Sequence, residues 1–387
     1  MSKPKIRFKG YCNDWERRKL GDIANVTKLA GFEFTEHVVY SDEGNIIALR
    51  GLNIKNGQLI LDDVKYIDGS NFSKLSRSKL FIDDIMFTYV GTVGEVAIIK
   101  ENDRFYLAPN VSRIRVKSDD SPKFISHYMR TDNFKNKVIF PLIATSSQPA
   151  LSMENIRKFT INIPISREEQ DCLAKYFDSL DHLITLHQRQ CENAKKLKKF
   201  MLQKMFPKKN QKNPEIRFVG FTNDWERRKL GEVIEVCSGR DYKHLDDGDI
   251  PVYGTGGYML SVSDALSYDE DAIGIGRKGT IDKPYILKAP FWTVDTLFYC
   301  IPKGDYDLKF LFSIFQNINW RAMDESTGVP SLSKAVINKV EILSPTLTEQ
   351  QKIGNYLSNL DHLITLHQNK CDELKKLKKF MLQNMFI

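Results

Sequence analysis

The chain lacks any long hydrophobic run. Its 387 residues contain no apolar stretch that approaches the ~18–20 residues of a membrane-spanning helix. The first ten residues, MSKPKIRFKG, are polar and lack the apolar core of a secretory signal peptide. We therefore expect a cytoplasmic chain with no membrane segment.

Cysteine is scarce and isolated. The six cysteines form no CxxC pair, which argues against a structural zinc site, and a cytosolic chain of this length needs no disulfide framework. Histidine is no more suggestive, because His182 and His187 are five residues apart and that step does not place two metal ligands on one face of a helix. No metal site is predicted.

Familiar catalytic motifs are also missing. The sequence contains no GxxxxGK[ST] loop for ATP, no HExxH, and no [ND]PP[YF] loop of the kind that holds a flipped base in amino-methyltransferases. The segment GIGRKG (274–279) is a literal GxGxxG, but Pro284 follows too soon for the helix that a dinucleotide site requires. We interpret this segment as a hairpin turn and predict a non-catalytic chain with no cofactor of its own.

Acidic residues are outnumbered by basic ones. Lysine and arginine total 57 against 49 acidic residues, which gives a formal net charge of +8. A basic excess suits a polyanionic partner such as DNA, because neutralising phosphates releases condensed counterions. Taken alone, this charge does not distinguish a DNA-binding protein from other basic proteins.

Two segments of the sequence occur twice. The short repeat, PKIRFKGYCNDWERRKLGDI (4–23), is identical to 214–233 at 14 of 20 positions. The long repeat, 168–206, is identical to 348–386 at 24 of 39 positions and contains LDHLITLHQ and KKLKKFMLQ in both copies. The chain is therefore predicted to contain two copies of one architecture.

Variable blocks separate these repeats, and the first block is 30 residues longer than the second. They still share a skeleton, since SSQPALS (146–152) parallels TGVPSLS (327–333) and VGTVG (90–94) is aligned with IGRKG (275–279). The predicted segments are a first domain 1–167 (short repeat 4–23, variable block 24–167), a long helix 168–206, a linker 207–213, a second domain 214–347 (short repeat 214–233, variable block 234–347) and a second long helix 348–387.

Each long repeat has the 3–4 spacing of apolar residues that is typical of a helix packed along one stripe. Thirty-nine residues at ~1.5 Å per residue would form a rod of about 58 Å. Two such helices in one chain are predicted to pair with each other, and packing of each helix on its own domain is the alternative. The predicted seam residues are Leu180, Ile184, Leu197, Met201, Leu360, Ile364, Leu377 and Met381.

Charge predicts the direction of this pairing. Residues 168–181 carry five acidic side chains and one lysine, whereas 189–206 carry six basic side chains and one acidic one. An antiparallel arrangement sets acidic ends against basic ends, and each exposed pair contributes a few tenths of a kcal/mol, ~0.3–0.5. We therefore predict an antiparallel coiled coil.

The variable blocks have patterns of mixed α/β structure. Residues 83–99 and 271–287 each contain two apolar runs around a glycine turn, which indicates a hairpin. Residues 124–140 and 310–326 are each predicted to form a single amphipathic helix. The predicted fold class is α+β, with two mixed α/β domains joined by two long helices in an antiparallel coiled coil and related by a pseudo-twofold repeat.

Side chains suited to reading DNA lie in the predicted loops of both blocks. Arginine and lysine suit guanine, and asparagine and glutamine suit adenine, because each pair can form two hydrogen bonds. The candidates are Arg50, Asn53, Tyr89, Thr92, Ser146, Ser147 and Gln148 in the first block, and Tyr253, Thr255, Arg277, Lys278, Ser326 and Thr327 in the second. The alternative for each is a solvated or turn-capping residue.

Trp15 and Trp225 are the central residues of the two NDWERRKLG segments. A tryptophan retained in two otherwise diverging halves is predicted to anchor each variable block to the common frame. Stacking on DNA is the alternative for the ring, and ERRK beside it could contact phosphates or a partner subunit.

The order of these features resembles the specificity (S) subunit of type I restriction–modification systems. The resemblance covers essentially the whole chain. It rests on the two NDWERRKLG segments, the two LDHLITLHQ…KKLKKFMLQ helices, and motifs of the variable blocks such as DIPVYGTGG (249–257) and SSQPALS (146–152).

This resemblance implies two target recognition domains, each of which reads one part of a bipartite sequence in double-stranded DNA. The long helices would act as a ruler and dock two methylation subunits, and restriction subunits would complete the nuclease. S-adenosylmethionine, ATP and magnesium would bind those partners, and adenine N6 would be the methylated atom. Since the blocks differ in sequence, the two half-sites should differ as well.

Two other classes of function stay open at the level of sequence. One is an enzyme, either a methyltransferase or a nucleotide-dependent protein that uses GIGRKG. The other is a protein-interaction scaffold or a stand-alone DNA-binding module without a restriction partner. Binding of S-adenosylmethionine or nucleotide by the chain alone would favour the enzyme, and absence of affinity for duplex DNA would favour the scaffold.

Overall fold

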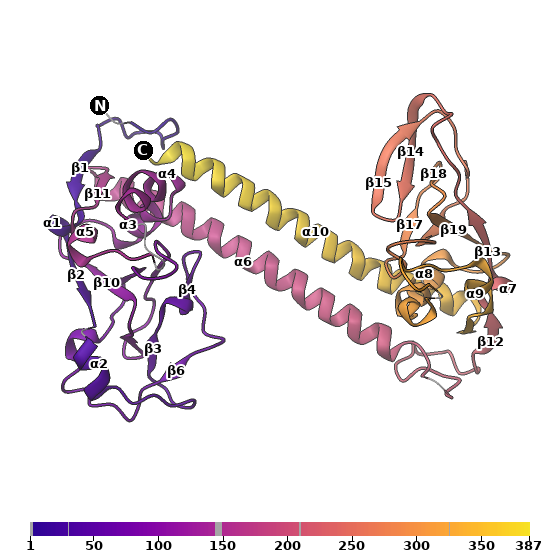
Figure 1. The fold of residues 1–387 in the computed structure, drawn as a ribbon, viewed down its shortest axis with the longest axis horizontal. Coiled ribbons are helices and arrows are strands. Elements are labelled where there is room, and N and C mark those ends of the chain that lie inside the picture. The colour runs from indigo at the N-terminus through magenta and orange to yellow at the C-terminus, as the bar shows by residue number, and fades with distance from the viewer. Residues whose placement is uncertain (1–2, 30, 144–148, 209, 325) are drawn as a thin grey trace. The chain divides into compact units, whose positions relative to one another are not determined.

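The computed structural model describes residues 3–29, 31–143, 149–208, 210–324 and 326–387, and it divides into two compact units (Figure 1). Unit 1 comprises Met1–Leu186 and Cys371–Ile387, and unit 2 comprises His187–Lys370. Each unit therefore contains one variable block together with part of each long helix. The predicted segmentation treats the long helices as separate segments, whereas the compact units share them.

Unit 1 is built on small antiparallel sheets. The first pairs β1 (Glu16–Lys19) with β11 (Thr160–Ile163) and attaches the short repeat to the end of the variable block. A four-stranded sheet has the order β2 (Ala24–Lys28), β10 (Val111–Val116), β7 (Ile85–Thr88), β8 (Val96–Ile98). A three-stranded sheet, with one parallel pair, has the order β6 (Lys65–Tyr66), β3 (Ile47–Leu49), β9 (Phe105–Leu107), and β4 (Ile54–Lys55) forms a hairpin with β5 (Gln58–Leu59).

Short helices connect the strands of unit 1. They are α1 (Leu20–Ile23), α2 (Gly31–His37), η1 (Gly51–Asn53), η2 (Ser76–Ser78), α3 (Pro122–Met129), α4 (Asp132–Phe134), η3 (Lys135–Ile139), η4 (Phe140–Leu142) and α5 (Met153–Arg157).

Unit 2 repeats this topology. Strand β12 (Glu226–Lys229) pairs with β20 (Glu341–Ser344), and a four-stranded sheet has the order β13 (Ile234–Ser238), β19 (Leu297–Pro302), β16 (Ala272–Gly276), β17 (Tyr285–Leu287). A three-stranded sheet has the order β15 (Gly257–Val262), β14 (Asp247–Gly254), β18 (Trp292–Thr293). The helices are α7 (Leu230–Val233), α8 (Leu308–Asn317), η5 (Trp320–Met323) and α9 (Lys334–Lys339).

Both predicted hairpins are present, but neither predicted amphipathic helix is a single one. Strand β7 pairs with β8, and β16 pairs with β17. Helix α3 ends at Met129, because the Thr131 side chain accepts a hydrogen bond from the Phe134 N–H and starts a new helix there. Helix α8 likewise ends at Asn317, before η5. The prediction of one continuous helix over 124–140 and over 310–326 was therefore wrong.

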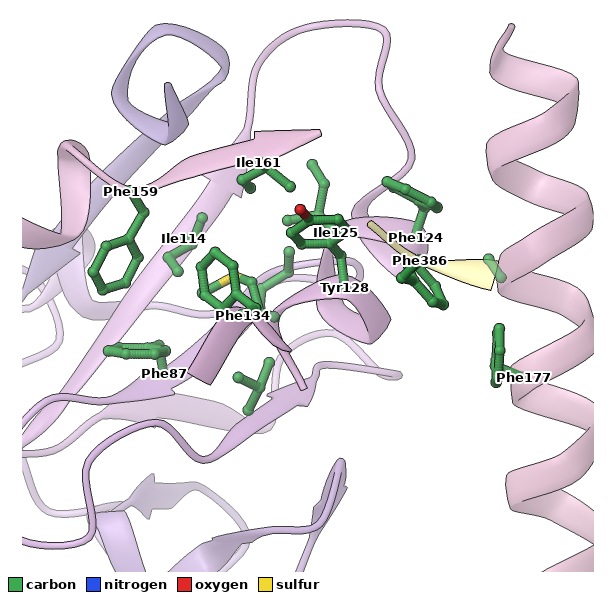
Figure 2. Close-up of a cluster of buried hydrophobic side chains, with 14 of the residues drawn as sticks. Phe87, Ile114, Phe124, Ile125, Tyr128, Phe134, Phe159, Ile161, Phe177 and Phe386 are labelled. Carbon is green, nitrogen blue, oxygen red and sulfur yellow. The ribbon is translucent and has the colours of Figure 1, made fainter. Parts of the chain in front are cut away.

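The core of each unit is completed by the residues that end a long repeat. In unit 1 the Phe386 ring lies 5.5 Å from the Phe124 ring and 5.2 Å from the Phe177 ring (Figure 2). In unit 2 the equivalent Phe206 ring stacks on Phe310 at 5.7 Å. Burial of one such side chain contributes ~1.5–3 kcal/mol, so these residues tie the long helices to the variable blocks.

The long helices are α6 (Arg167–Lys204) and α10 (Leu347–Met385), and they pack together in antiparallel directions. In unit 1 the Lys378 ammonium pairs with Asp181, and in unit 2 the Lys198 ammonium lies 2.5 Å from an Asp361 oxygen. Residues early in one helix thus meet residues late in the other. The predicted antiparallel pairing is confirmed, with acidic starts of helices against basic ends.

Two of the predicted seam residues are misplaced. Leu197 and Leu377 are 40% and 43% exposed, whereas Lys198 is buried at 8%. The alternating 3–4 spacing through Cys191 and Ala194 continues to position 198, and only the apolar character of leucine favoured position 197. Leu180, Ile184 and Leu360 are buried, and Met201, Ile364 and Met381 are half-buried.

The described residues contain neither a membrane-spanning helix nor a cluster of metal ligands. None of their helices is both long and apolar enough to cross a bilayer. Within the same residues, no group of three histidine, cysteine, aspartate or glutamate side chains is arranged to hold a metal ion.

Candidate nucleic-acid interface

The predicted loops of unit 1 meet at one edge of its sheets. The Ala108 N–H donates to the Leu49 carbonyl at 3.1 Å, and the Tyr89 N–H donates to the Asn110 carbonyl at 3.1 Å. These bonds bring together the loops that follow β3 and β7 and the turn that precedes β10. We name residues 50–53, 89–94, 109–110 and 149–151 the first loop edge.

The segment 149–151 is held against the turn that follows β7. The Leu151 N–H donates to the Tyr89 carbonyl at 2.8 Å, and the Gly91 N–H donates to the Pro149 carbonyl at 2.9 Å. The predicted candidates Ser146, Ser147 and Gln148 lie outside the described residues. The residues directly after them therefore belong to the first loop edge.

Unit 2 has the same hydrogen bonds at equivalent positions. The Leu332 N–H donates to the Arg277 carbonyl at 2.9 Å, the Gly279 N–H to the Pro330 carbonyl at 2.8 Å, and the Arg277 N–H to the Thr296 carbonyl at 2.8 Å. The Val294 N–H donates to the Tyr253 carbonyl at 3.0 Å. We name residues 253–257, 277–280, 294–296 and 330–332 the second loop edge.

These matching bonds correct the predicted alignment of the two glycine turns. The sequence comparison set Gly91 against Gly276, whereas the bonds to Pro149 and Pro330 set Gly91 against Gly279. The shift is three residues. Gly276 is the last residue of β16. A Cβ at this position would lie 2.1 Å from the Thr280 carbonyl oxygen, so glycine is needed because the two backbone segments approach each other closely.

Asn53 supports the first loop edge from inside. It is fully buried, and its side chain accepts from the Arg50 N–H at 3.0 Å and donates to the Ile60 and Asp63 carbonyls at 2.9 and 2.7 Å. A side chain with these partners has no hydrogen-bonding group left for a base. We therefore assign Asn53 a positioning role in place of the predicted base contact.

The other first-edge candidates surround a cleft of about 410 Å³. Arg50 and Thr92 line it together with Asn110, and the Arg50 guanidinium donates to the Asp63 carboxylate at 2.7 Å. Tyr89 is half-buried beside the Lys28 ammonium, and its burial raises the pKa of the phenol. This cleft offers a cation, hydroxyl groups and an amide to a ligand.

The cations of the second loop edge are more exposed than Arg50 of the first edge. Arg277 and Lys278 are exposed at the turn after β16, and no helix begins there to hold a pyrophosphate. The Arg277 guanidinium lies 5.8 Å from the Phe298 ring centre and 3.4 Å from the Asp295 carbonyl, with no carboxylate partner among the described residues. A Cβ built on Gly279 would lie 3.9 Å from the Thr255 hydroxyl, so Thr255 adjoins this turn.

Ser326 and Thr327 differ in their surroundings. The Ser326 hydroxyl donates to the Asp324 carboxylate at 2.8 Å, and the same carboxylate accepts from the Ser331 N–H at 2.9 Å. Hydrogen bonds from Ser331 and Ser326 lower the pKa of Asp324. Ser326 therefore helps to close the loop before 330–332, while Thr327 is exposed.

Tyr258 on the β14–β15 hairpin was not among the predicted candidates, although its neighbour Tyr253 was. The Tyr253 ring lies 6.4 Å from that of Tyr258 and 6.1 Å from that of Tyr285, whose hydroxyl donates to the Gly254 carbonyl at 2.6 Å. Tyr258 is 63% exposed and Met259 49% exposed. The run YGTGGYM signals a hairpin tip with outward side chains, from which Tyr258 could have been chosen.

Trp15 and Trp225 are buried away from the loop edges. The Trp15 ring lies 5.6 Å from Phe124, and its indole N–H is 3.4 Å from Glu169, which Arg7 holds with two hydrogen bonds. In unit 2 the Trp225 ring lies 5.8 Å from Phe310. Both rings contact residues of the variable block and the end of a long repeat, which fits an anchoring role and leaves no face free to stack on DNA.

Comparisons with known proteins agree with this geometry. The model of the type I restriction modification DNA specificity domain matches residues 13–196 and 222–376. The putative type I restriction enzyme MjaX specificity subunit of Methanocaldococcus jannaschii is 25% identical over 403 residues, covering 95% of this chain and 91% of that protein. The MjaVIII specificity subunit of the same organism is 24% identical over 356 residues, 80% of each chain.

A solved structure supports the fold over the full length. The S subunit of a type I restriction–modification system from M. genitalium superimposes with a TM-score of 0.73 at 16% identity, covering 100% of this chain and 99% of that one. Both variable blocks and both long helices fall within this match.

Proposed function

Because this chain belongs to the family of type I restriction–modification DNA specificity subunits, we propose that each of its loop edges reads one part of a bipartite DNA sequence. The chain is the non-catalytic specificity component of a type I restriction enzyme. The proposal adds where DNA is read, that the two parts of the target differ, and which surfaces hold the partner subunits.

One observation carries the proposal. The loop edges of the two units are held by the same backbone hydrogen bonds, but they have different side chains at equivalent positions. The same backbone hydrogen bonds form in both units, from Gly91 to Pro149 and from Gly279 to Pro330. At the position after the equivalent strands, however, unit 1 has Tyr89 and unit 2 has Arg277. One scaffold with two sets of side chains suits two different half-sites, in contrast to the palindrome that a homodimer reads.

Arg277 and Lys278 are the strongest candidates for contacts with bases or phosphates. Both are exposed at a loop tip, and a guanidinium can donate two hydrogen bonds to the O6 and N7 atoms of guanine. Thr255 adjoins their turn, and the rings of Tyr253 and Tyr258 lie 6.4 Å apart on the neighbouring hairpin of the same unit. At the first edge, the predicted contacts Arg50, Tyr89 and Thr92 line or flank the cleft, and the sequence places Ser146, Ser147 and Gln148 just before its fourth segment.

Substitution of Arg277 with alanine is expected to weaken discrimination at one half-site by ~1–3 kcal/mol, because a lost bidentate contact removes that much selectivity. The measurement is competitive binding of the assembled complex to duplexes that carry single base changes in either half-site. Arg227→Ala is the control, since Arg227 is also exposed but lies on β12 beside Glu341. Equal discrimination by R277A and the wild type would remove Arg277 from the reading surface.

Partner docking is proposed for two apolar patches on the long helices. The patch in unit 1 consists of Leu183, Leu186, Leu377 and Phe380, and the patch in unit 2 of Leu197, Phe200, Leu363 and Leu366, with exposed fractions from 39% to 53%. These side chains follow Leu180, Ala194, Leu360 or Leu374 by three and six positions, and these four residues are buried or half-buried in the seam. The spacing places the members of each patch on one flank of the helix pair in their own unit.

The two patches have the same residues because they come from the two copies of the long repeat. Exposed apolar groups of this kind mark protein-binding surfaces. Two identical patches fit two copies of one partner, and we assign them to two methylation subunits. Restriction subunits, S-adenosylmethionine, ATP and magnesium belong, in this proposal, with those partners, and adenine N6 is the methylated atom.

The test of the proposed function is modification sequencing of DNA from cells that express this chain with a type I methylation subunit. A new methylated-adenine motif in two parts separated by a fixed gap is the expected result. It would also give both half-sites at once. If the complex assembles and no such motif is found, the proposal of bipartite reading is wrong.

A further inference from the structure

The hairpin β4–β5 of unit 1 lies on helix α6, next to a cavity of about 630 Å³. The Gln58 side-chain amide donates to the Thr185 hydroxyl at 2.8 Å, and the Arg130 guanidinium donates to the Asn56 carbonyl at 2.9 Å. Gly57, Gln58 and Thr185 all line the cavity. The tip of the hairpin is therefore held to α3 and α6 by individual polar contacts beside open space rather than by a packed apolar core.

Arg130 is the centre of these contacts. Its guanidinium lies 3.1 Å from the Asp181 carboxylate of α6, and Asp181 also pairs with Lys378 of α10. Gly57 has a φ of +84°, a left-handed conformation that favours glycine, and its turn lies directly against the Arg130 guanidinium. The side chain thus connects the seam of the long helices to the hairpin.

The opposite end of the same hairpin leads into the first loop edge. Strand β4 begins directly after η1, which ends at Asn53, and the Ile60 N–H donates back to the Asn53 carbonyl at 2.8 Å. The Asp63 carbonyl accepts from both the Asn53 amide at 2.7 Å and the Arg50 guanidinium at 2.9 Å. The position of Arg50 therefore depends on residues that the hairpin connects.

Unit 2 lacks this arrangement. Gln316 occupies the place of Arg130, because each residue is nine positions after the N-cap of its helix, Asp307 or Ser121. The side-chain amide oxygen of Gln316 accepts a hydrogen bond from the Lys198 ammonium at 2.7 Å. Strand β14 passes directly into β15 through residues 254–257, without an additional hairpin. Any effect of the hairpin must therefore be confined to the half-site that unit 1 reads.

We propose that hairpin β4–β5 is a positioning element that fixes the first loop edge relative to helix α6, and that Arg130 is the residue that holds it. This inference rests on the proposed reading of DNA by the first loop edge. Arg130 acts on recognition through the hairpin and through Asn53, and Arg50 is the side chain whose place it sets.

The test compares Arg130→Gln, which installs the unit 2 residue, with the wild type in the assembled complex with methylation subunits. The expected result is that discrimination against single base changes falls by a factor of about 3 to 30 at the half-site read by unit 1. Discrimination at the other half-site should not change. A merely structural defect would lower total binding without this difference between half-sites.

Two further variants keep the test informative if R130Q fails to fold. Gln58→Ala removes a single hydrogen bond at the hairpin tip and should shift discrimination in the same direction by a smaller factor. Gln316→Ala is the matched control in unit 2 and should leave discrimination at the half-site read by unit 1 unchanged, because Gln316 contacts Lys198 of unit 2. Equal loss at both half-sites with R130Q would overturn the role of the hairpin. So would unchanged discrimination with Q58A when R130Q does not fold, or a loss at the half-site read by unit 1 caused by Q316A.

The wild-type motif is determined first by modification sequencing. Absence of any bipartite motif would contradict the proposed function itself. A bipartite wild-type motif whose discrimination the folded R130Q and Q58A variants leave unchanged would contradict only the positioning role.

Discussion

Replacement of Trp225 with alanine is expected to destabilise unit 2 by ~3–5 kcal/mol, the range for removing a large aromatic side chain from a packed core. Trp225 is 3% exposed and is enclosed by Phe206 and Phe310, at ring distances of 6.0 and 5.8 Å. Loss of the ring would separate the end of the long repeat from the variable block. Recognition of the second half-site should then be lost, because its loop edge depends on that frame.

Denaturant unfolding of the isolated chain followed by tryptophan fluorescence measures this effect. The four tryptophans are Trp15, Trp225, Trp292 and Trp320, so that Trp15 reports on unit 1 and the last two still report on unit 2 in the variant. The transition of unit 2 should move to lower denaturant concentration. An unchanged midpoint for Trp225→Ala would show that the ring is not an anchor.

Phenylalanine substitutions are the matched controls for the two anchors. The Trp15 indole N–H lies 3.4 Å from Glu169, whereas the Trp225 indole N–H is buried with no hydrogen-bond partner in the described parts of the chain. Trp15→Phe should therefore cost ~0.5–1.5 kcal/mol more than Trp225→Phe, the usual net value of one hydrogen bond. The reverse order would contradict the assignment of the Glu169 contact.

The long helices were predictable because two independent signals agree in them. A 3–4 spacing of apolar residues is maintained over the full repeat, and the charge of each helix changes sign along its length. Together these signals indicate that each repeat forms a helix, that the two helices pair, and that they run in antiparallel directions, without reference to the rest of the chain. The hairpins at β7–β8 and β16–β17 were equally accessible, since a glycine turn between two apolar runs is a local signal.

The details that sequence missed depend on tertiary contacts. Lys198 takes a seam position because Asp361 and Gln316 receive its charge, and neither partner is adjacent in sequence. Asn53 is polar and lies next to a glycine turn, which suggested a base contact, but its three backbone partners bury it. In both cases the hydrogen-bond partners that decide where the side chain lies were not visible in the sequence.

Asn53 and Arg277 differ in whether the fold leaves their side chains available to a ligand. Both are polar residues beside glycine turns. Asn53 begins a connection that returns to its own loop through Ile60 and Asp63. Arg277, in contrast, follows strand β16, and its turn is closed by backbone groups of Thr296 and Pro330. A turn that is closed by backbone atoms leaves its side chains available for a ligand, and that distinction requires the structure.

Replacement of Phe200 and Phe380 with aspartate is expected to abolish assembly with the methylation subunits. Phe380 is the most exposed member of its patch, at 53%, and Phe200 is the second most exposed member of the other patch, at 46%. An aspartate there would be buried without a partner in the complex, and the loss of one aromatic hot spot alone costs about 2–4 kcal/mol. Each single variant should therefore release one methylation subunit, and the double variant both.

The mass of the purified complex measures this stoichiometry directly. Gln203→Asp and Gln383→Asp are the matched controls, because these exposed residues follow the patch phenylalanines by three positions and receive the same charge outside the patch. The isolated variants should fold as the wild type does, since both phenylalanines already face solvent in part. A double variant that still binds two methylation subunits would exclude the patches as docking surfaces. Release of one subunit by F200D and of the other by F380D would show that the repeated helix presents the same surface twice, once for each methylation subunit.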